Sequence, residues 1–333
     1  MSAVLDGEIM EEAEGFVVLR RGAGLSRLDD RSLLLVRGED RGSFLQGMLS
    51  NEVGTLAAGS GTPALLLTEQ GRVVADLRVY VRENDILLDV PSGRRDDVRA
   101  ALERFIVADD VEIDDRSERG LGLRGPGAVE VVAKVTGTDC GIETEAAHAH
   151  VHIAEREGLI ARATDLGVDG FHLWLAVDDL EAVAAELVAA GARSVGPAVL
   201  ESQRVVAGIG RWGAEFGLET LAPEVPSLES SISYRKGCYL GQEVVERIAA
   251  RGHVNWKVAV LKSPGSIASG DVIFAGDEEV GRVTSSVRRP DDGSFWALAR
   301  LRAVRSEPGT VLSVASDAER WEAEVVAPEP RDA

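Results

Sequence analysis

The stretch that decides the fold is Lys-Gly-Cys-Tyr-Leu-Gly-Gln-Glu at residues 236–243, followed by a helix-compatible run, 244–250. Its two glycines permit a close approach of the backbone to another segment, so we predict a tight turn that leads into a helix near Gly241. Cys238 then lies just before a helix N-terminus, where free N–H groups and neighbouring cations favour the thiolate. The alternative is an ordinary turn and capped helix with a small buried cysteine.

The composition is that of a globular protein with several cores. A chain of 333 residues is long enough for two or three domains. The net charge of −20 argues against a general binder of nucleic acid or of anionic membranes, which needs clustered cations. No apolar run reaches the roughly 18 residues of a membrane span. Residues 1–14 carry acidic but no basic side chains, the reverse of a signal peptide, and the only cysteines are Cys140 and Cys238. We therefore expect a reducing, cytoplasmic location.

The N-terminal third predicts a mixed sheet-and-helix domain. Residues 15–20 and 32–37 are short apolar runs typical of strands, and Asp40 is positioned to cap a short helix. The other expected elements are strands at 64–67, 72–81, 86–90 and 111–113 and a helix at 94–107. The charged run 114–119 is the expected end of this domain.

The strand at 72–81 has two different faces. Alternation places Val74, Asp76, Arg78 and Tyr80 on one face and apolar side chains on the other. A face that carries a carboxylate, a guanidinium and a phenol suits the floor of a ligand site. A half-solvated antiparallel strand has the same pattern, so both interpretations stay open.

Residues 120–191 predict a split β-α-β module. The glycines of 120–125 match G-x-G-x-x-G, but a charged run precedes them and Leu121 and Leu123 fit a strand, so a nucleotide site is disfavoured. A helix from Pro126, a hairpin at 151–163, a strand at 171–177 and a helix at 180–187 follow. Histidines alternate at 148, 150 and 152, which fits an exposed strand face or a surface metal site. From residue 254, six short β runs predict a small barrel.

Several motifs carry a resemblance to a known family. The stretch 236–243, with Arg247 after it, resembles the signature of the YgfZ-like folate-binding proteins, relatives of the glycine-cleavage T-protein (aminomethyltransferase). Residues 38–53 resemble the family's N-terminal pattern, and residues 281–286 resemble its G-x-V-T-S motif. The resemblance implies an α+β, three-domain aminomethyltransferase-like fold, with ferredoxin-like domains and a C-terminal β-barrel around a central channel. The expected parts are 1–119, 120–210, a connecting loop and signature helix at 211–253, and the barrel at 254–333.

The resemblance also implies tetrahydrofolate, or a derivative, as the cofactor. In the T-proteins two adjacent aspartates lie at the position of Ala75 and Asp76, and a glutamate that helps hold the pterin lies at the position of His172. Arg204, on the expected helix 197–208, keeps the second arginine of a family motif. The residues expected to contact folate are Asp76, Tyr80, His172, Arg204, Lys236, Tyr239, Gln242, Glu243 and Arg247.

Two functions follow from this pattern. An intact signature beside an altered T-protein site favours a folate-binding protein that assists iron–sulfur cluster assembly or repair, with Cys238 as the reactive group and iron–sulfur proteins or assembly factors as partners. One thiol does not hold a cluster, so the partner must contribute ligands. The alternative is a folate-dependent aminomethyltransferase in which Asp76 positions the folate nitrogen. A folate-binding protein with no chemistry of its own is a third possibility.

Overall fold

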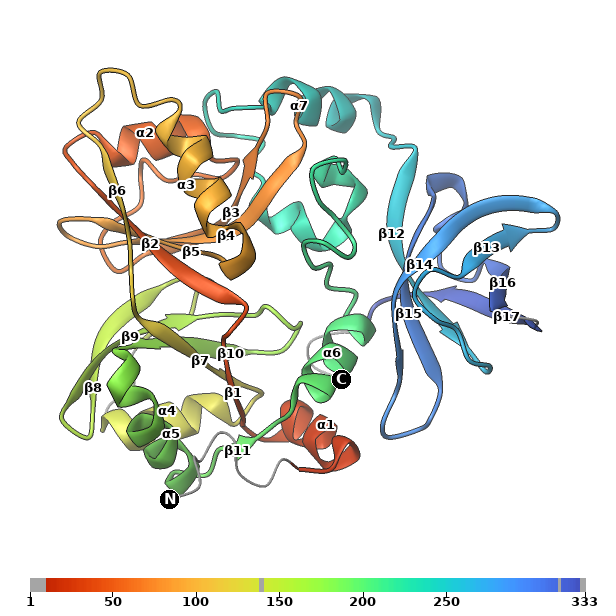
Figure 1. Ribbon diagram of the computed structural model, residues 1–333, viewed down its shortest axis with the longest axis horizontal. Helices are drawn as coiled ribbons and strands as arrows, with labels where there is room; N and C mark the ends of the chain where they lie inside the picture. Colours follow the sequence, from red (N-terminus) through yellow and green to blue (C-terminus); the bar gives the residue numbers. More distant parts are fainter. Residues whose placement is uncertain (1–9, 138–140, 317–318, 330–333) are drawn as a thin grey trace.

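The computed structural model describes residues 10–137, 141–316 and 319–329, so Cys140 lies outside the described residues. Within these ranges the chain forms a five-stranded sheet, a six-stranded sheet and a closed β-barrel. In Figure 1 the two sheets lie one above the other, and the barrel stands to one side of them. No helix in the described ranges is both long enough and apolar enough to span a membrane.

The five-stranded sheet is antiparallel throughout, in the order β3-β4-β5-β2-β6. Its strands are β2 (Arg31–Arg37), β3 (Gly61–Leu67), β4 (Val73–Val81), β5 (Ile86–Pro91) and β6 (Glu112–Asp115). Helices α2 (Arg41–Met48) and α3 (Arg95–Glu103) pack on one face and bury Phe44, Leu45 and Leu102 there. The predicted strands and helices of this region are confirmed. The Asp40 side chain, however, caps nothing in α2 and instead accepts the N–H of Asp110 at 2.9 Å.

The six-stranded sheet has the order β11-β1-β7-β10-β9-β8. Its strands are β1 (Gly24–Arg27), β7 (Arg119–Arg124), β8 (His148–Ile153), β9 (Arg156–Arg162), β10 (Gly170–Leu175) and β11 (Arg193–Ser194). Helices α4 (Ala128–Thr136) and α5 (Leu180–Ala189) pack against it. The glycine-rich segment is confirmed as strand β7. Gly125, with φ +109°, makes the turn after that strand where a Cβ would lie 2.4 Å from the carbonyl of Gly22.

The N-terminal segment differs from its prediction. Residues 15–20 were expected to form a strand, but they lie in helix α1 (Glu12–Arg21). Phe16 and Leu19, three residues apart, lie on one side of this helix and are fully buried; a short apolar run does not by itself distinguish a helix from a strand. Strand β1 then pairs with β7 and β11 of the six-stranded sheet. The boundary that assigned all of residues 1–119 to one domain is therefore wrong at its N-terminal end.

The two sheets pack against each other through one face of each. Their shared core contains Leu33 and Tyr80 from the five-stranded sheet and Leu159 and Trp174 from the six-stranded sheet. The face of β4 that carries Asp76, Arg78 and Tyr80 therefore meets a second sheet rather than bulk solvent. This long-range packing decides what those polar side chains contact.

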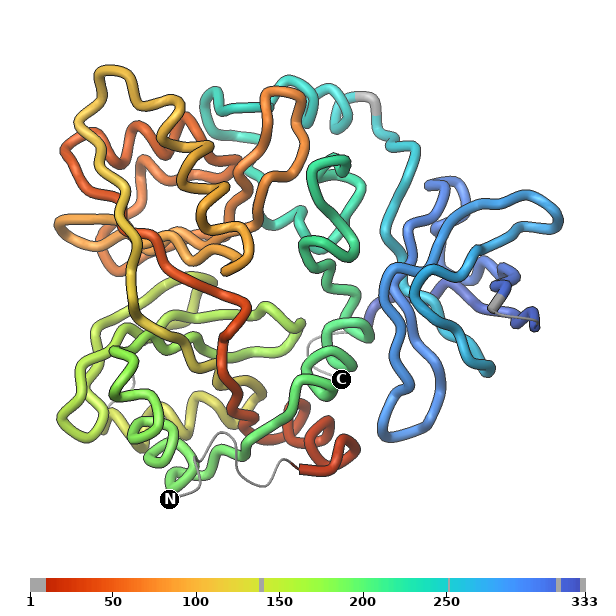
Figure 2. The backbone as a smooth tube through the Cα atoms, in the orientation of Figure 1, coloured from red at the N-terminus to blue at the C-terminus, as the bar shows by residue number. Residues whose placement is uncertain are grey.

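A long connection joins the sheets to the barrel. Helix α6 (Pro197–Val206) is followed by the 3₁₀ turns η3 (Ala222–Glu224) and η4 (Pro226–Ser231) and then by α7 (Gln242–Arg251). Figure 2 shows the chain rising from α6 past both sheets, crossing at α7 and descending into the barrel. Gly241 has φ +82° at the start of α7, and a Cβ there would lie 2.4 Å from the carbonyl of Thr68. The predicted close backbone approach at this glycine is confirmed.

The barrel closes because β12 pairs with both β15 and β17. Its strands are β12 (Trp256–Ser263), β13 (Val272–Ala275), β14 (Glu278–Arg288), β15 (Phe295–Arg302), β16 (Val311–Ser316) and β17 (Glu319–Val326). Alternate residues of these strands fill its interior, including Leu261, Ile273 and Val314. The predicted C-terminal barrel is confirmed.

Candidate functional site

A cavity of about 600 Å³ lies where the two sheets meet the connection after α6. Strand β4 and turn η1 (Ser92–Arg94) form one side, the 164–166 loop forms another, and residues 209–212 and 227–231 complete it. We call it the junction cavity. Its size falls in the range of about 300–1,000 Å³ that is typical of small-molecule sites. Its charged lining residues are Asp30, Arg31, Asp76, Arg78, Arg94, Glu145, Asp165, Arg204 and Arg211.

Strand β4 contributes Asp76 and Arg78, which lie two residues apart and so share a face. The Asp76 carboxylate is 2.9 Å from Nη1 of Arg31 and keeps 29% of its side chain exposed. Arg78 donates to Glu145 at 3.1 Å, and Glu145 also accepts the hydroxyl of Thr164 at 2.9 Å. Both carboxylates are thus held by arginines while still lining the cavity.

Beneath these residues lies the fully buried carboxylate of Asp89. It accepts Nε of Arg31 at 2.6 Å and the hydroxyl of Tyr80 at 2.9 Å, and it lies 3.1 Å from Nδ1 of His172. Burial alone would raise the pKa of Asp89, but Arg31, His172 and Arg78 together hold it well below its usual range. A buried carboxylate that stays ionised in this way fixes the orientation of Arg31, and through it that of Asp76.

His172 joins the two sheets. Its Nδ1 faces Asp89 and its Nε2 lies 3.0 Å from Asp165. Because Asp89 is ionised, it only accepts hydrogen bonds. Asp165 receives two further bonds from Arg124, Nε to Oδ1 at 3.1 Å and Nη2 to Oδ2 at 2.9 Å. With both carboxylates ionised, each ring nitrogen of His172 has to donate, which is the geometry of an imidazolium.

Arg94 and Trp212 form the most open basic part of the cavity wall. The Arg94 guanidinium lies 4.2 Å from the centre of the Trp212 ring and 2.6 Å from the partly exposed carboxylate of Asp97. The indole N–H of Trp212 is buried and has no hydrogen-bond partner among the described residues. The sequence analysis missed both residues, although Trp212 lies in the glycine- and proline-rich connection that it treated as a loop.

Comparison with known proteins places this architecture. The family model described as "GCVT N-terminal domain" matches residues 11–232, and "Glycine cleavage T-protein C-terminal barrel domain" matches residues 257–332. The chain belongs to the glycine-cleavage T-protein family. The predicted relationship to the T-protein is therefore confirmed, while a closer kinship with YgfZ-like proteins stays a prediction.

Individual relatives agree with this assignment. The chain is 30% identical to an aminomethyltransferase of Thermus thermophilus over 280 residues, which cover 83% of this chain and 79% of the relative. It is also 30% identical to an aminomethyltransferase of Geobacillus kaustophilus over 328 residues, or 96% and 89% of the two chains. The crystal structure of the glycine cleavage system aminomethyltransferase T from Bartonella henselae superposes with a TM-score of 0.84 at 21% identity, covering 95% of this chain and 88% of that one. That superposition confirms the predicted three-part T-protein fold.

Two of the residues expected to contact folate do not reach the cavity. Tyr80 and His172 are both fully buried, and their polar atoms are engaged by Asp89 and, for His172, by Asp165 as well. The correction has one cause: the sequence places both residues on the polar face of a strand, and sheet-on-sheet packing covers that part of the face. They position other groups instead of contacting a ligand.

Arg204 does line the junction cavity, but its charge is already matched. It is buried and forms ion pairs with Glu201 at 2.6 Å and Glu215 at 2.8 Å, and it donates to the hydroxyl of Ser285 at 2.8 Å. Ser285 belongs to β14 of the barrel. Arg204 therefore ties α6 to the barrel, and the predicted anion-binding role is replaced by a structural one.

The signature stretch lies apart from the junction cavity. The Lys236 ammonium donates to the carbonyls of Gln46, Leu49 and Asn51 at 2.6, 2.6 and 2.9 Å, and it lies 5.2 Å from the centre of the Tyr239 ring. These bonds hold the signature on the chain segment that follows α2. The expected role of Lys236 as a folate contact is thus wrong in this structure.

Cys238 is exposed and free, three residues before the first full turn of α7, and it does not line the junction cavity. The alternative of a buried cysteine is therefore wrong, and so is the expectation that its sulfur faces the folate site. Tyr239 is buried.

The remaining signature residues lie on α7 and do not line the junction cavity either. Gln242 accepts the N–H of Tyr239 at 3.3 Å and donates to Glu246 at 2.6 Å. Glu243 and Arg247 are exposed, and the ion pair predicted between them is not formed among the described residues. Helix α7 is therefore a surface element in this structure, and the predicted folate contacts from it are corrected.

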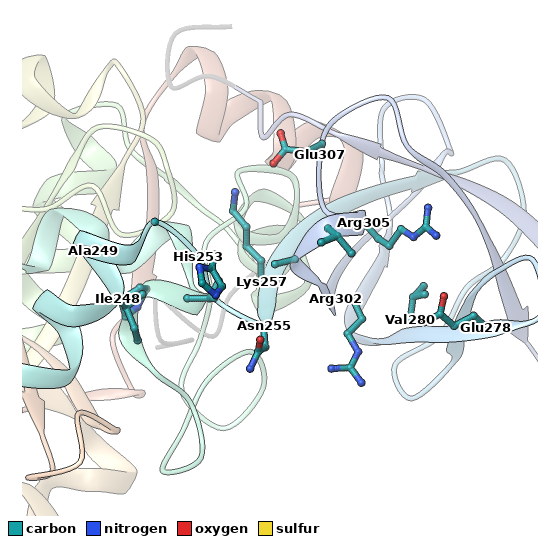
Figure 3. A pocket seen from close by; sticks show the side chains of 15 residues that line it. Ile248, Ala249, His253, Asn255, Lys257, Glu278, Val280, Arg302, Arg305 and Glu307 are labelled. Atoms are coloured by element: carbon teal, nitrogen blue, oxygen red, sulfur yellow. The ribbon is translucent and has the colours of Figure 1, made fainter.

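A second hollow, of about 790 Å³, lies between the end of α7 and the barrel. In Figure 3 its cations Lys257, Arg302 and Arg305 point in different directions, and Glu278 and Glu307 lie far apart on its rim. Functional sites instead bring polar groups together on one spot. The junction cavity is therefore the better candidate despite its smaller volume.

The alternating histidines give no metal site in the described part of the chain. His148 is buried, with Nδ1 3.2 Å from the carbonyl of Ala146, while His150 and His152 are exposed. Among the described residues no group of three or more histidine, cysteine, aspartate or glutamate side chains is arranged to hold a metal ion.

Proposed function

We propose that this chain binds a tetrahydrofolate in the junction cavity. The observation that carries the proposal is the wall itself, where ionised Asp76 and Asp165 and the guanidinium of Arg94 face one cavity in a member of the T-protein family. Five arginines oppose four acidic residues there, although the whole chain has a net charge of −20. Such a local excess of cations suits the carboxylates of a folate tail.

The residues present fit the parts of the cofactor. The partly exposed carboxylates accept hydrogen bonds from N–H groups of a reduced pterin, and the Trp212 ring offers an apolar surface for an aromatic group. Arg94, whose partner Asp97 is more than half exposed, is available to bind an anionic tail. When bound, tetrahydrofolate supplies a nitrogen that carries a one-carbon unit.

The reaction that we propose is aminomethyl transfer, the activity for which the similar curated proteins are named. Asp76 is the residue that we assign to it. Arg31 holds this carboxylate in place at 2.9 Å, and its exposed fraction leaves oxygen lone pairs free to orient an N–H group or to hold a proton at the reacting nitrogen. Ala75 lacks the second carboxylate of the T-protein pattern, so Asp76 would act alone.

A second candidate function rests on a different observation. Cys238 presents an exposed thiol beside the N-terminus of α7, within the YgfZ-like signature. An accessible thiol outside the folate cavity suits exchange with, or transient ligation by, an iron–sulfur partner protein. On this proposal folate and thiol act at separate places on the molecule.

Two measurements test these proposals. Calorimetry should show saturable tetrahydrofolate binding by the parent chain, weakened about tenfold in Asp76→Asn and unchanged in Asp114→Asn, a surface carboxylate of the same sheet. Absence of binding by the parent chain contradicts the shared proposal. Turnover of an aminomethylated lipoyl carrier protein, abolished in Asp76→Asn, supports the transferase; no turnover, together with a Cys238-dependent rescue of iron–sulfur enzymes in deficient cells, supports the second function instead.

A further inference from the structure

Asp165 is built into the cavity wall with unusual support. It lies in the loop between β9 and β10, beside Thr164 and Leu166, and all three line the junction cavity. Its side chain is 20% exposed, while Arg124, which holds it in a bidentate ion pair, is only 5% exposed. Arg124 donates in turn to the hydroxyl of Ser26 at 2.8 Å.

The bonds around this carboxylate are asymmetric. Oδ2 accepts from both Arg124 and His172, whereas Oδ1 accepts only Nε of Arg124 at 3.1 Å. Each carboxylate oxygen has two lone pairs, so Oδ1 keeps an acceptor position free. Burial would raise the pKa of Asp165, but Arg124 and His172 hold it well below the usual value, so the free position belongs to an anion.

This arrangement relates to the altered position 172. The T-protein pattern has a pterin-holding glutamate there, and this chain has a histidine that is fully buried and lies 3.0 Å from Asp165. The side chain at 172 thus does not reach the cavity, but the carboxylate that it supports does. A cation at 172 and a carboxylate at 165 together again present a negative group at the cavity wall.

We propose that Asp165 is the specificity-determining residue of the junction cavity and that it accepts the paired N–H donors of a 2-amino-4-oxo-pyrimidine ring edge. The inference rests on the proposed folate function, because it names the part of the ligand that this wall reads. Arg124 and His172 are positioning residues that preorganise the acceptor. A ligand without the 2-amino group leaves one acceptor of a desolvated carboxylate unpaired and binds more weakly.

The test compares ligands and variants together. Affinities of tetrahydrofolate, a tetrahydropterin and its analogue without the 2-amino group are measured by calorimetry or competition for the parent chain, Asp165→Asn and Asp169→Asn. Asp169 is the matched control, because it lies in the same loop and pairs with Arg162 at 2.8 Å but does not line the cavity.

We expect Asp165→Asn to weaken tetrahydrofolate binding about 10- to 100-fold, and Asp169→Asn to leave it within about twofold. The parent chain should favour the 2-amino pterin over its analogue by about tenfold, and this preference should disappear in Asp165→Asn. A purely structural role would weaken both pterins equally and preserve their ratio, which overturns the inference.

The outcomes separate the two levels of the argument. If the parent chain binds no tetrahydrofolate, the proposed function fails. If it binds tetrahydrofolate and Asp165→Asn binds it equally well, only the inference about Asp165 fails. If Asp165→Asn does not fold, the pair of pterins on the parent chain still decides, since equal affinities contradict recognition of the 2-amino edge.

Discussion

Substitution of Asp89 by asparagine should destabilise the protein by about 3–5 kcal/mol, because the change leaves buried cations without their counter-charge. Asp89 is fully enclosed and compensates Arg31 at 2.6 Å, Arg78 at 3.8 Å and His172 at 3.1 Å. At about 2–4 °C per kcal/mol, the melting temperature should fall by roughly 6–20 °C. Scanning calorimetry at neutral pH measures this shift, and Asp114→Asn, whose carboxylate pairs with Arg37 at the surface of the same sheet, should change stability by less than about 1 kcal/mol.

The pH dependence gives the same prediction a sign. The folded-state pKa of Asp89 is lowered, so its stabilisation is complete above the unfolded value of about 3.9 and is lost as the pH falls toward the folded value. The difference in stability between the parent chain and Asp89→Asn should therefore be constant above about pH 5 and shrink below about pH 4. A loss in Asp89→Asn no larger than that in Asp114→Asn would refute the reasoning that this buried network holds the two sheets together.

Three further predictions concern the cavity and the signature. Lys236→Met should remove the cation shared by three backbone carbonyls and destabilise the protein by about 2–4 kcal/mol in urea unfolding, and unchanged stability would contradict the assigned role. Arg94→Ala should lower tetrahydrofolate affinity about 5- to 10-fold in a fluorescence titration, because the cation beside Trp212 is lost; retained affinity would exclude it as the tail contact. Cys238→Ser should leave that affinity within about twofold, and Cys238 in the folded parent chain should react rapidly with a thiol reagent when followed by peptide mass spectrometry.

Local patterns predicted much of the fold. The alternation along residues 72–81 placed Asp76, Arg78 and Tyr80 on one face, and the structure has them there on β4. The six β runs after residue 254 gave the barrel strands, because turn residues separate them at short intervals. In both cases the information lies within a few consecutive residues.

What failed to follow from the sequence depends on partners distant along the chain. Lys236 was expected to meet an anion, yet its partners are carbonyls at residues 46–51, about 190 positions earlier. His172 was expected at the ligand, yet Asp89 and Asp165 enclose it because two sheets pack face to face. No local pattern states which face of one sheet meets another, so the carboxylate of Asp165 escaped notice although it lines the cavity.

The central claim is that a reduced folate binds in the junction cavity, with its pterin against β4 and the 164–166 loop. The crystal structure of the tetrahydrofolate complex tests this claim most directly. The account predicts the pterin between Asp76 and Asp165 and the folate tail near Arg94 and Trp212. Ligand density beside α7 and the barrel, or a junction cavity that stays empty at saturating tetrahydrofolate, would contradict it.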